Sequence, residues 1–178
     1  LGKLLGMSKA GIFKYYKNKQ ELFIAVVDKF WFSTQNPRNK FTETNGTFAE
    51  FIDEYVRGVQ RTMDMLGDLI GAEREKVAQG KFTYHAQYFH FLFQLLQYDP
   101  DAKEKLRNLV EVDYAYWRAA IQRAIATGEL REDVDVEDAV VMFRQVYMGL
   151  SFEMAFMGGL NTQRLAKHLH AVYSLLKR

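Results

Sequence analysis

Apolar residues recur every three to four positions along most of the chain, which is the spacing of amphipathic α-helices. Asn18 followed by Glu21 predicts one helix start, with the helix continuing to Phe32. Thr47 followed by Glu50 predicts a second start, where one broad apolar face begins. That face comprises Phe48, Phe51, Ile52, Tyr55, Val56, Val59, Met63 and Leu66.

The middle of the chain contains a polar interruption and an unusually apolar segment. Residues 33–46 are polar and contain Pro37, so we expect a loop there. A shorter helix is predicted over residues 69–78. Residues 84–98 are apolar nearly all round a helix, which predicts a helix that runs through the centre of the body.

Capping residues also predict the remaining helices. Asp99 with Pro100 predicts a long helix that ends at Gly128, where a glycine can close the last turn. Asp135 predicts the start of another helix, which runs to about residue 158. The last helix starts at Asn161 or Thr162 and buries a stripe of Leu165, Leu169, Val172 and Leu176.

Charge is unevenly distributed along the 178 residues. The net charge is +2, but residues 1–20 carry five lysines and no acidic residue, so residues 21–178 carry 2 − 5 = −3. This asymmetry indicates a small basic surface for phosphates on a neutral to acidic body. The chain has no cysteine, which excludes disulfides and thiolate metal sites and is compatible with the cytoplasmic location that we expect. The longest uncharged stretch, residues 82–98, is too short to span a bilayer, so we expect no membrane partner.

The most specific motif lies at residues 6–23, GMSKAGIFKYYKNKQELF. It predicts a short helix capped by Ser8, a tight turn, and a second helix, with lysines interleaved among Phe13, Tyr15 and Tyr16. This is the second half of a helix-turn-helix, which points to DNA.

The motif resembles the DNA-binding segment of the TetR-type transcriptional repressors. The resemblance implies that a first helix and the start of the second precede Leu1. It implies an all-α fold, with an incomplete helix-turn-helix domain over residues 1–32 and a ligand-binding and dimerisation bundle over residues 33–178. The matching residues are Gly6, Met7, Ser8, Ile12, Phe13, Tyr15, Tyr16, Asn18, Lys19 and Leu22.

The expected partner of the N-terminal part is a double-stranded DNA operator. We expect Lys9, Ala10 and Gly11 near base edges. Apolar positions in excess of one core face, together with the resemblance, imply a homodimer through the helices near 101–127 and 136–157 and a palindromic operator. The residues expected on phosphates are Ser8, Lys14, Tyr15, Lys17 and Lys19.

The resemblance also implies release of the repressor by a small-molecule effector bound in the body. The candidate lining favours a largely apolar or aromatic molecule, although aromatic positions at helical spacing also suit a plain core. Gln87, His90, Gln94 and Glu153 lie among apolar residues, where each must find a protein partner or a ligand. The candidate lining comprises Phe51, Tyr55, Met63, Tyr84, Tyr88, Phe91, Tyr114, Trp117, Phe143 and Tyr147.

Two other classes of function are weighed against a regulator. An enzyme is disfavoured because His85 and His90 are five residues apart, a spacing that does not suit a metal pair, and because no phosphate-binding glycine loop or nucleophile motif is present. We therefore expect no cofactor and no metal. The alternative is a helical protein-interaction module with a basic N-terminal patch and no specific DNA site, which would explain the charge asymmetry but not the ordered pattern from Ser8 to Leu22.

Overall fold

The structure is a computed structural model that describes residues 11, 14–41, 46–69 and 84–178, without the side chains of residues 66–69 and 84–87. Over these residues the chain is helical, which confirms the all-α prediction. An isolated antiparallel bridge pairs Leu130 with Lys177. The helices are α3 (Lys19–Val26), η1 (Val27–Trp31), α4 (Phe32–Gln35), η2 (Pro37–Asn39), α5 (Phe48–Leu69), α7 (Tyr84–Tyr98), α8 (Ala102–Ala126), α9 (Val136–Ala155) and α10 (Thr162–Leu176).

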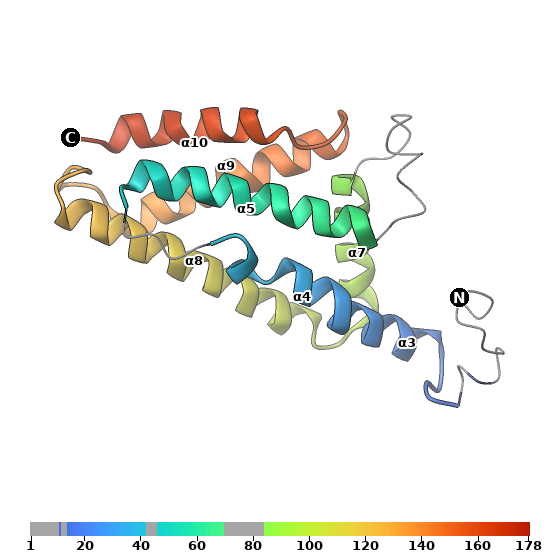
Figure 1. Cartoon of the computed structure of the whole chain (residues 1–178). Helices are drawn as coiled ribbons and strands as arrows, with labels where there is room; N and C mark the ends of the chain where they lie inside the picture. Colours follow the sequence, from blue (N-terminus) through green and yellow to red (C-terminus); the bar gives the residue numbers. More distant parts are fainter. Residues whose placement is uncertain (1–10, 12–13, 42–45, 70–83) are drawn as a thin grey trace.

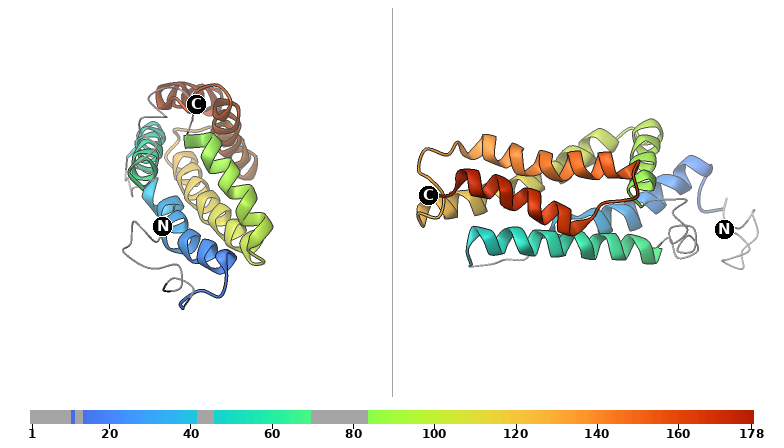
Figure 2. Two further views of the ribbon diagram at one scale, coloured as in Figure 1. Left: turned by 90° about the vertical axis from the view of Figure 1, so that its right-hand side faces the viewer. Right: turned by 90° about the horizontal axis from the view of Figure 1, so that it is seen from above.

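The helices pack as an elongated bundle (Figures 1 and 2). α10 lies against α5 and α9, and α8 lies against α9 and α5. α3, η1 and α4 follow one another as one rod at the side of the bundle, and α7 connects α9 with the start of this rod. The C-terminus lies at the end of the bundle opposite to α3 (Figure 1).

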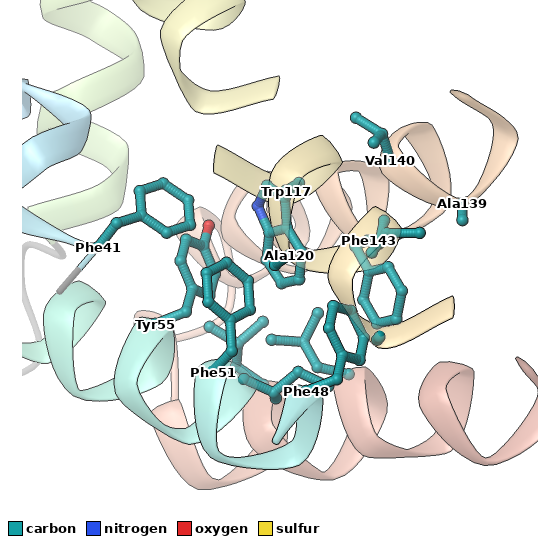
Figure 3. Packing of buried hydrophobic residues seen from close by; sticks show 14 of the residues in the cluster. Phe41, Phe48, Phe51, Tyr55, Trp117, Ala120, Ala139, Val140 and Phe143 are labelled. Carbon is teal, nitrogen blue, oxygen red and sulfur yellow. The ribbon is translucent and has the colours of Figure 1, made fainter. Parts of the chain in front are cut away.

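The main core lies between α5, α8, α9 and α10 and consists largely of aromatic rings (Figure 3). Trp117 stacks on Phe143 with 4.9 Å between ring centroids and meets the edges of Phe51 and Tyr55 at 5.1 and 4.9 Å. Each buried aromatic side chain removes about 150–250 Å² from water. This packing is therefore a large part of what holds the helices together.

Side-chain caps fix the helix starts that the sequence predicts. At α5 the Thr47 amide donates to Glu50 Oε2 at 2.8 Å, and the Glu50 amide donates to Thr47 Oγ1 at 3.2 Å. The pair is a reciprocal capping box. Asp135 and Asn161 each accept the amide three residues later, at 2.9 and 2.8 Å, so Asn161 rather than Thr162 caps α10.

α8 begins later than predicted but ends as predicted. The helix starts at Ala102 rather than at Pro100, because the buried Asp99 accepts the amide two residues later, at 2.9 Å, and forms a turn before the helix. At the other end Gly128 has φ 74°, and the amides of residues 128 and 129 donate to carbonyls of the last turn at 3.0 and 2.9 Å. This is a Schellman motif, which favours glycine at the left-handed position.

The predicted loop over residues 33–46 is wrong in its first half. α4 carries the helix on to Gln35, and η2 follows as a 3₁₀ turn. Asn36 caps this turn by accepting the Arg38 amide at 3.0 Å. Pro37 ends the α-helix because it has no amide to donate, yet it fits the first position of the next turn.

The predicted burial of α7 is also wrong, although its bounds are as predicted. Leu95 is fully buried and Phe89 nearly so, but Phe93 is 60% exposed. Leu96 and Tyr98 are exposed as well. α7 thus lies at the surface of the bundle rather than at its centre. The predicted helix over residues 69–78 falls outside the described residues, apart from Leu69 at the end of α5.

Glu129 joins separate elements at the end of the bundle far from α3. Its carboxylate accepts the amides of Phe48 and Ala49 at 2.7 and 3.3 Å and so caps α5. It also accepts the Tyr173 hydroxyl of α10 at 2.9 Å. Arg131 adds to this connection by donating its amide to a carbonyl at the end of α10 at 3.1 Å. The loop after α8 therefore ties α5 and α10 together.

The chain between η2 and α5 crosses α5 at Gly58. A Cβ atom on Gly58 would lie 2.1 Å from the carbonyl oxygen of Lys40 and 2.5 Å from its Cα. Because both neighbours are backbone, only a residue without a side chain fits here. This close approach brings Lys40 into the interior, where its side chain is buried.

Candidate functional site

Exposed basic side chains surround the start of α3. Asn18 caps this helix by accepting the Glu21 amide at 2.8 Å, and the Glu21 carboxylate accepts the amide of Lys17 at 2.7 Å rather than that of Asn18. Free amides give a helix start a partial positive charge, which favours phosphate. The exposed side chains here are Lys14, Tyr15, Lys17 and Lys19.

The other predicted DNA contacts lie further towards the N-terminus. Gly11 is helical and half-buried, whereas residues 8–10, the predicted Ser8, Lys9 and Ala10, lie outside the described residues. The structure therefore brings together most of the predicted phosphate contacts. It does not describe two of the three residues that we expect near base edges.

The rod that follows these lysines packs against α7 and α8 through a second apolar cluster. We call this cluster the joint cluster; it consists of Val27, Trp31, Leu95 and Ala102. Trp31 stacks on Tyr88 of α7 with 5.7 Å between centroids. The rod passes through η1, a π-helical turn at this place, and such turns are frequent at functional sites.

Ion pairs fasten the joint cluster at its surface. Lys105 of α8 donates to Asp28 of the rod at 2.7 Å and to Asp99 at 2.9 Å. Gln20 in α3 donates its side-chain amide to the Tyr98 carbonyl at 2.6 Å. The N-terminal part is thus bound to one end of α7 and to the start of α8.

Polar side chains converge inside the bundle beside the aromatic core; we call Tyr55, Asp113, Trp117, Arg144 and Tyr147 the polar core. Arg144 Nε lies 2.6 Å from Asp113 Oδ2, with side chains 12% and 4% exposed. Within the described residues, the Tyr55 hydroxyl, Trp117 Nε1, Asp113 Oδ1 and Arg144 Nε and Nη1 are buried without a hydrogen-bond partner. Buried polar groups normally have partners, so this cluster is suited to a bound polar group.

Burial and charge dominate the electrostatics of the polar core. Burial, and then the Asp113 carboxylate, raise the pKa of Tyr55 well above its ordinary value. Burial, followed by Tyr147, also raises the pKa of Tyr88. Burial alone would lower the pKa of Arg144, but Asp113 and the neighbouring tyrosines more than offset it, and the net direction is upward. Tyr55 and Tyr88 are therefore neutral and Arg144 is charged at neutral pH.

Lys40 places a second cation beside the polar core. Its Nζ lies 5.0 Å from the centroid of the Tyr147 ring, and Arg144 Cζ lies 5.5 Å from the same centroid. The electron-rich face of an aromatic ring attracts cations. Tyr147 therefore links Arg144 to the chain segment that follows α4.

The predicted ligand lining falls into separate places. Tyr55, Trp117 and Tyr147 belong to the polar core, with Tyr88 near it. Phe51 and Phe143 pack in the aromatic core, and Phe91 packs against the joint cluster. The side chain of Tyr84 lies outside the described residues. The half-buried Met63 and Tyr114 pack at the margin of the core.

Aromatic spacing in the sequence does not identify Asp113 and Arg144 of the polar core, nor the neighbouring Lys40. A signal was present: Asp113 lies four residues before Trp117, and Arg144 three before Tyr147, so each shares a helix face with a predicted core aromatic. Of the polar residues singled out instead, His90 and Glu153 are exposed.

An apolar surface remains on the outside of α9. Val141, Met142 and Phe152 are 44%, 41% and 48% exposed, and Phe156, just after the helix, is 71% exposed. Met142, Phe152 and Phe156 follow the three- and four-residue spacing of one helix face, which also includes Gln145 and Gly149. Gly149 on this face has no heavy atom within 4 Å of the place where a Cβ would lie. Such a face is suited to a partner helix.

None of the described helices is both long and apolar enough to cross a membrane.

The comparisons with known proteins identify the class of this bundle. A family model described as "Tetracyclin repressor-like, C-terminal domain" matches residues 49–170, from the start of α5 into α10. The chain belongs to this family, whose members are transcriptional regulators rather than enzymes. A search of the curated proteins and a search of the solved structures found no match.

Proposed function

We propose that this protein is a homodimeric DNA-binding repressor, which a small, largely apolar or aromatic ligand releases from a palindromic operator. One observation carries the proposal. The exposed lysines lie around the start of α3, and the rod that α3 begins connects them to a body that contains the polar core. The rod connects a surface suited to phosphate with an interior suited to a ligand.

The DNA part of the proposal rests on charge and helix geometry. Lys14, Lys17 and Lys19 project beside a capped helix start, where backbone amides and side chains favour the same phosphates. Phosphate contacts position a protein on DNA, whereas base contacts set the sequence that it prefers. We therefore assign these lysines to affinity and the residues before them to specificity.

The test is fluorescence anisotropy with the DNA upstream of the protein's own gene and with a scrambled duplex, at several salt concentrations. Lys19→Ala should weaken binding to both duplexes alike and reduce the salt slope by about one. Lys167→Ala removes the same charge from an exposed position on α10 and is the matched control. A change in sequence preference would contradict the assignment of Lys19 to phosphate. Weak binding that ignores sequence would favour the interaction module with a basic patch.

The dimer is proposed to form through α8 and α9. The exposed apolar face of α9 supports this, and α8 offers exposed Val112 together with the small residues Ala115 and Ala119, which allow a close approach. Met142→Glu should shift sedimentation towards the monomer, because it places a charge in the interface. Gln163→Glu makes the same charge change at an exposed position of α10 and should leave the dimer intact. A monomeric starting protein, or an unchanged Met142→Glu dimer, would refute this interface.

The proposed route from ligand to DNA runs through Tyr88 and Lys40. Tyr88 stacks on Trp31 of the joint cluster and interacts electrostatically with Arg144 and Tyr147. Lys40 lies over Tyr147 and ends η2, the short turn that follows the rod. A ligand that displaces either side chain would therefore change how the rod packs against the body. Tyr147→Ala should weaken release by a ligand while leaving operator affinity intact; equal losses of both would assign Tyr147 to the core alone.

A further inference from the structure

The unpartnered groups of the polar core differ in what they can bond. Trp117 Nε1 and Arg144 Nη1 can only donate, the Tyr55 hydroxyl can donate or accept, and Asp113 Oδ1 can only accept. Donors therefore outnumber acceptors. A molecule that satisfies these groups must bring acceptor oxygens, and one of them must face a guanidinium.

Charge leads to the same kind of molecule. Lys40 is buried and Arg144 is half-buried, and Asp113 is the acidic residue that pairs with Arg144. Both cations face the Tyr147 ring, at 5.0 and 5.5 Å. The polar core with Lys40 therefore carries one positive charge in excess, which favours an anionic ligand over a neutral one. A single negative charge on a ligand would balance it, whereas a doubly charged phosphate would overshoot.

The geometry of the Arg144–Asp113 pair leaves the guanidinium available. Nε lies close to Asp113 Oδ2 but its N–H is not directed at that oxygen, and Nη1 has no acceptor among the described residues. Guanidinium groups bind carboxylates through two parallel hydrogen bonds. Arg144 and Tyr147 are half-buried whereas Tyr55 and Trp117 are buried, so the Arg144 side of the cluster lies nearer the surface. The Tyr55 oxygen and the Trp117 nitrogen lie on the same side of the aromatic cluster in Figure 3.

We propose that the polar core binds the carboxylate of a monoanionic organic acid, with Arg144 as its ion-pair partner, Tyr55 and Trp117 as neighbouring donors, and the surrounding aromatic rings against its apolar body. This inference rests on the proposed function, since it specifies the class of the regulatory ligand. It makes the negative charge of the ligand, and not only its apolar surface, the feature that is recognised.

The experiment compares acids with amides of the same shape. The probes are 2-naphthoate with 2-naphthamide, 3-phenylpropanoate with 3-phenylpropanamide, and decanoate with decanamide, each at 1 mM and 5 mM with the whole chain. At least one acid should raise Tm by about 3 °C or more at ten times its Kd. Its amide should give a much smaller shift. Equal shifts for acid and amide, or no shift with any acid at 5 mM, would overturn the proposal.

Two variants test the residues in opposite directions. Arg144→Lys keeps the charge but loses the planar pair of donors, so affinity for the acid should fall at least tenfold. Asp113→Asn removes the competing carboxylate, so affinity for the acid should rise while affinity for the amide stays the same. An acid whose affinity is unchanged in both variants binds elsewhere, which would contradict the assignment. One variant should lower affinity for the acid and the other should raise it, so a general loss of stability would not produce both results.

DNA binding measured with the same preparations separates this inference from the proposed function. If operator binding is specific but no acid binds, the ligand class is wrong and the repressor proposal stands. If an acid binds through Arg144 but no DNA is recognised, the site stands and the repressor proposal falls.

Discussion

Gly58→Ala tests whether the chain after η2 is clamped against α5. In a free helix alanine is favoured over glycine by about 1 kcal/mol, so the local expectation is a gain. Here the new Cβ would lie 2.1 Å from the Lys40 carbonyl oxygen, whereas ordinary contact begins near 3.4 Å. The backbone must then move by 3.4 − 2.1 = 1.3 Å, and no side-chain rotation can relieve the overlap. Overpacking of this kind costs about 1–3 kcal/mol, so after the gain in helix propensity we expect a net loss of about 1 kcal/mol, and of at most about 2 kcal/mol.

Urea unfolding followed by circular dichroism measures this free energy. Gly149→Ala is the matched control, because it lies inside α9 with open space around the new methyl group and should raise stability by up to about 1 kcal/mol. Sedimentation should accompany both measurements, since Gly149 lies on the proposed dimer face. A Gly58→Ala protein as stable as the starting protein, or more stable, would show that the chain at Lys40 yields freely. The close approach would then carry no structural constraint.

Three further predictions follow from contacts in the bundle. Tyr55 and Tyr88 have pKa values raised above 10.0 in the folded chain, so their neutral forms stabilise the fold fully below pH 10 and this contribution falls as the pH rises above it. Above pH 10 each tyrosine lowers the free energy of unfolding by about 1.4 kcal/mol per pH unit. Tyr55→Phe should therefore make the fall in this free energy between pH 9 and 11, measured by urea unfolding, less steep; an unchanged slope would contradict this. Glu129→Gln removes the charge that caps α5 at Phe48 and should cost about 1–2 kcal/mol in the same assay at neutral pH; no loss would mean that water replaces this cap. Lys105→Met breaks both ion pairs of the rod and should lower stability by about 1–3 kcal/mol, whereas a neutral effect would mark the pairs as surface contacts.

Local chemistry explains which parts of the fold the sequence predicts well. Thr47, Asp135 and Asn161 bond amides within three residues, so their effect does not depend on the rest of the fold. Gly128 acts in the same way at the end of α8. Such signals predict helix ends closely because both partners lie in one short stretch of sequence.

Tertiary packing explains the errors. The apolar residues of α7 do not tell which neighbours cover them, and Phe93 remains exposed because no described helix packs over it. The Asp113–Arg144 pair depends on the register of α8 against α9, which a hydrophobic pattern does not fix to one residue. Aromatic spacing therefore predicts some residues of the candidate lining. The charged residues that give the polar core its chemistry can be identified only once the packing of α8 against α9 is known.

The hydrogen bonds of Glu129 hold α5 and α10 together at one end of the bundle. Opening α5 from α10 there would break the cap of α5 and the hydroxyl bond of Tyr173 together, at the end farthest from α3. We therefore expect the bundle to open more easily at its other end, beside α3. A small displacement inside the body would then grow with distance along the bundle and be greatest near the lysines around the start of α3. On this reasoning, the bonds of one carboxylate at one end of the bundle favour displacement at the other end.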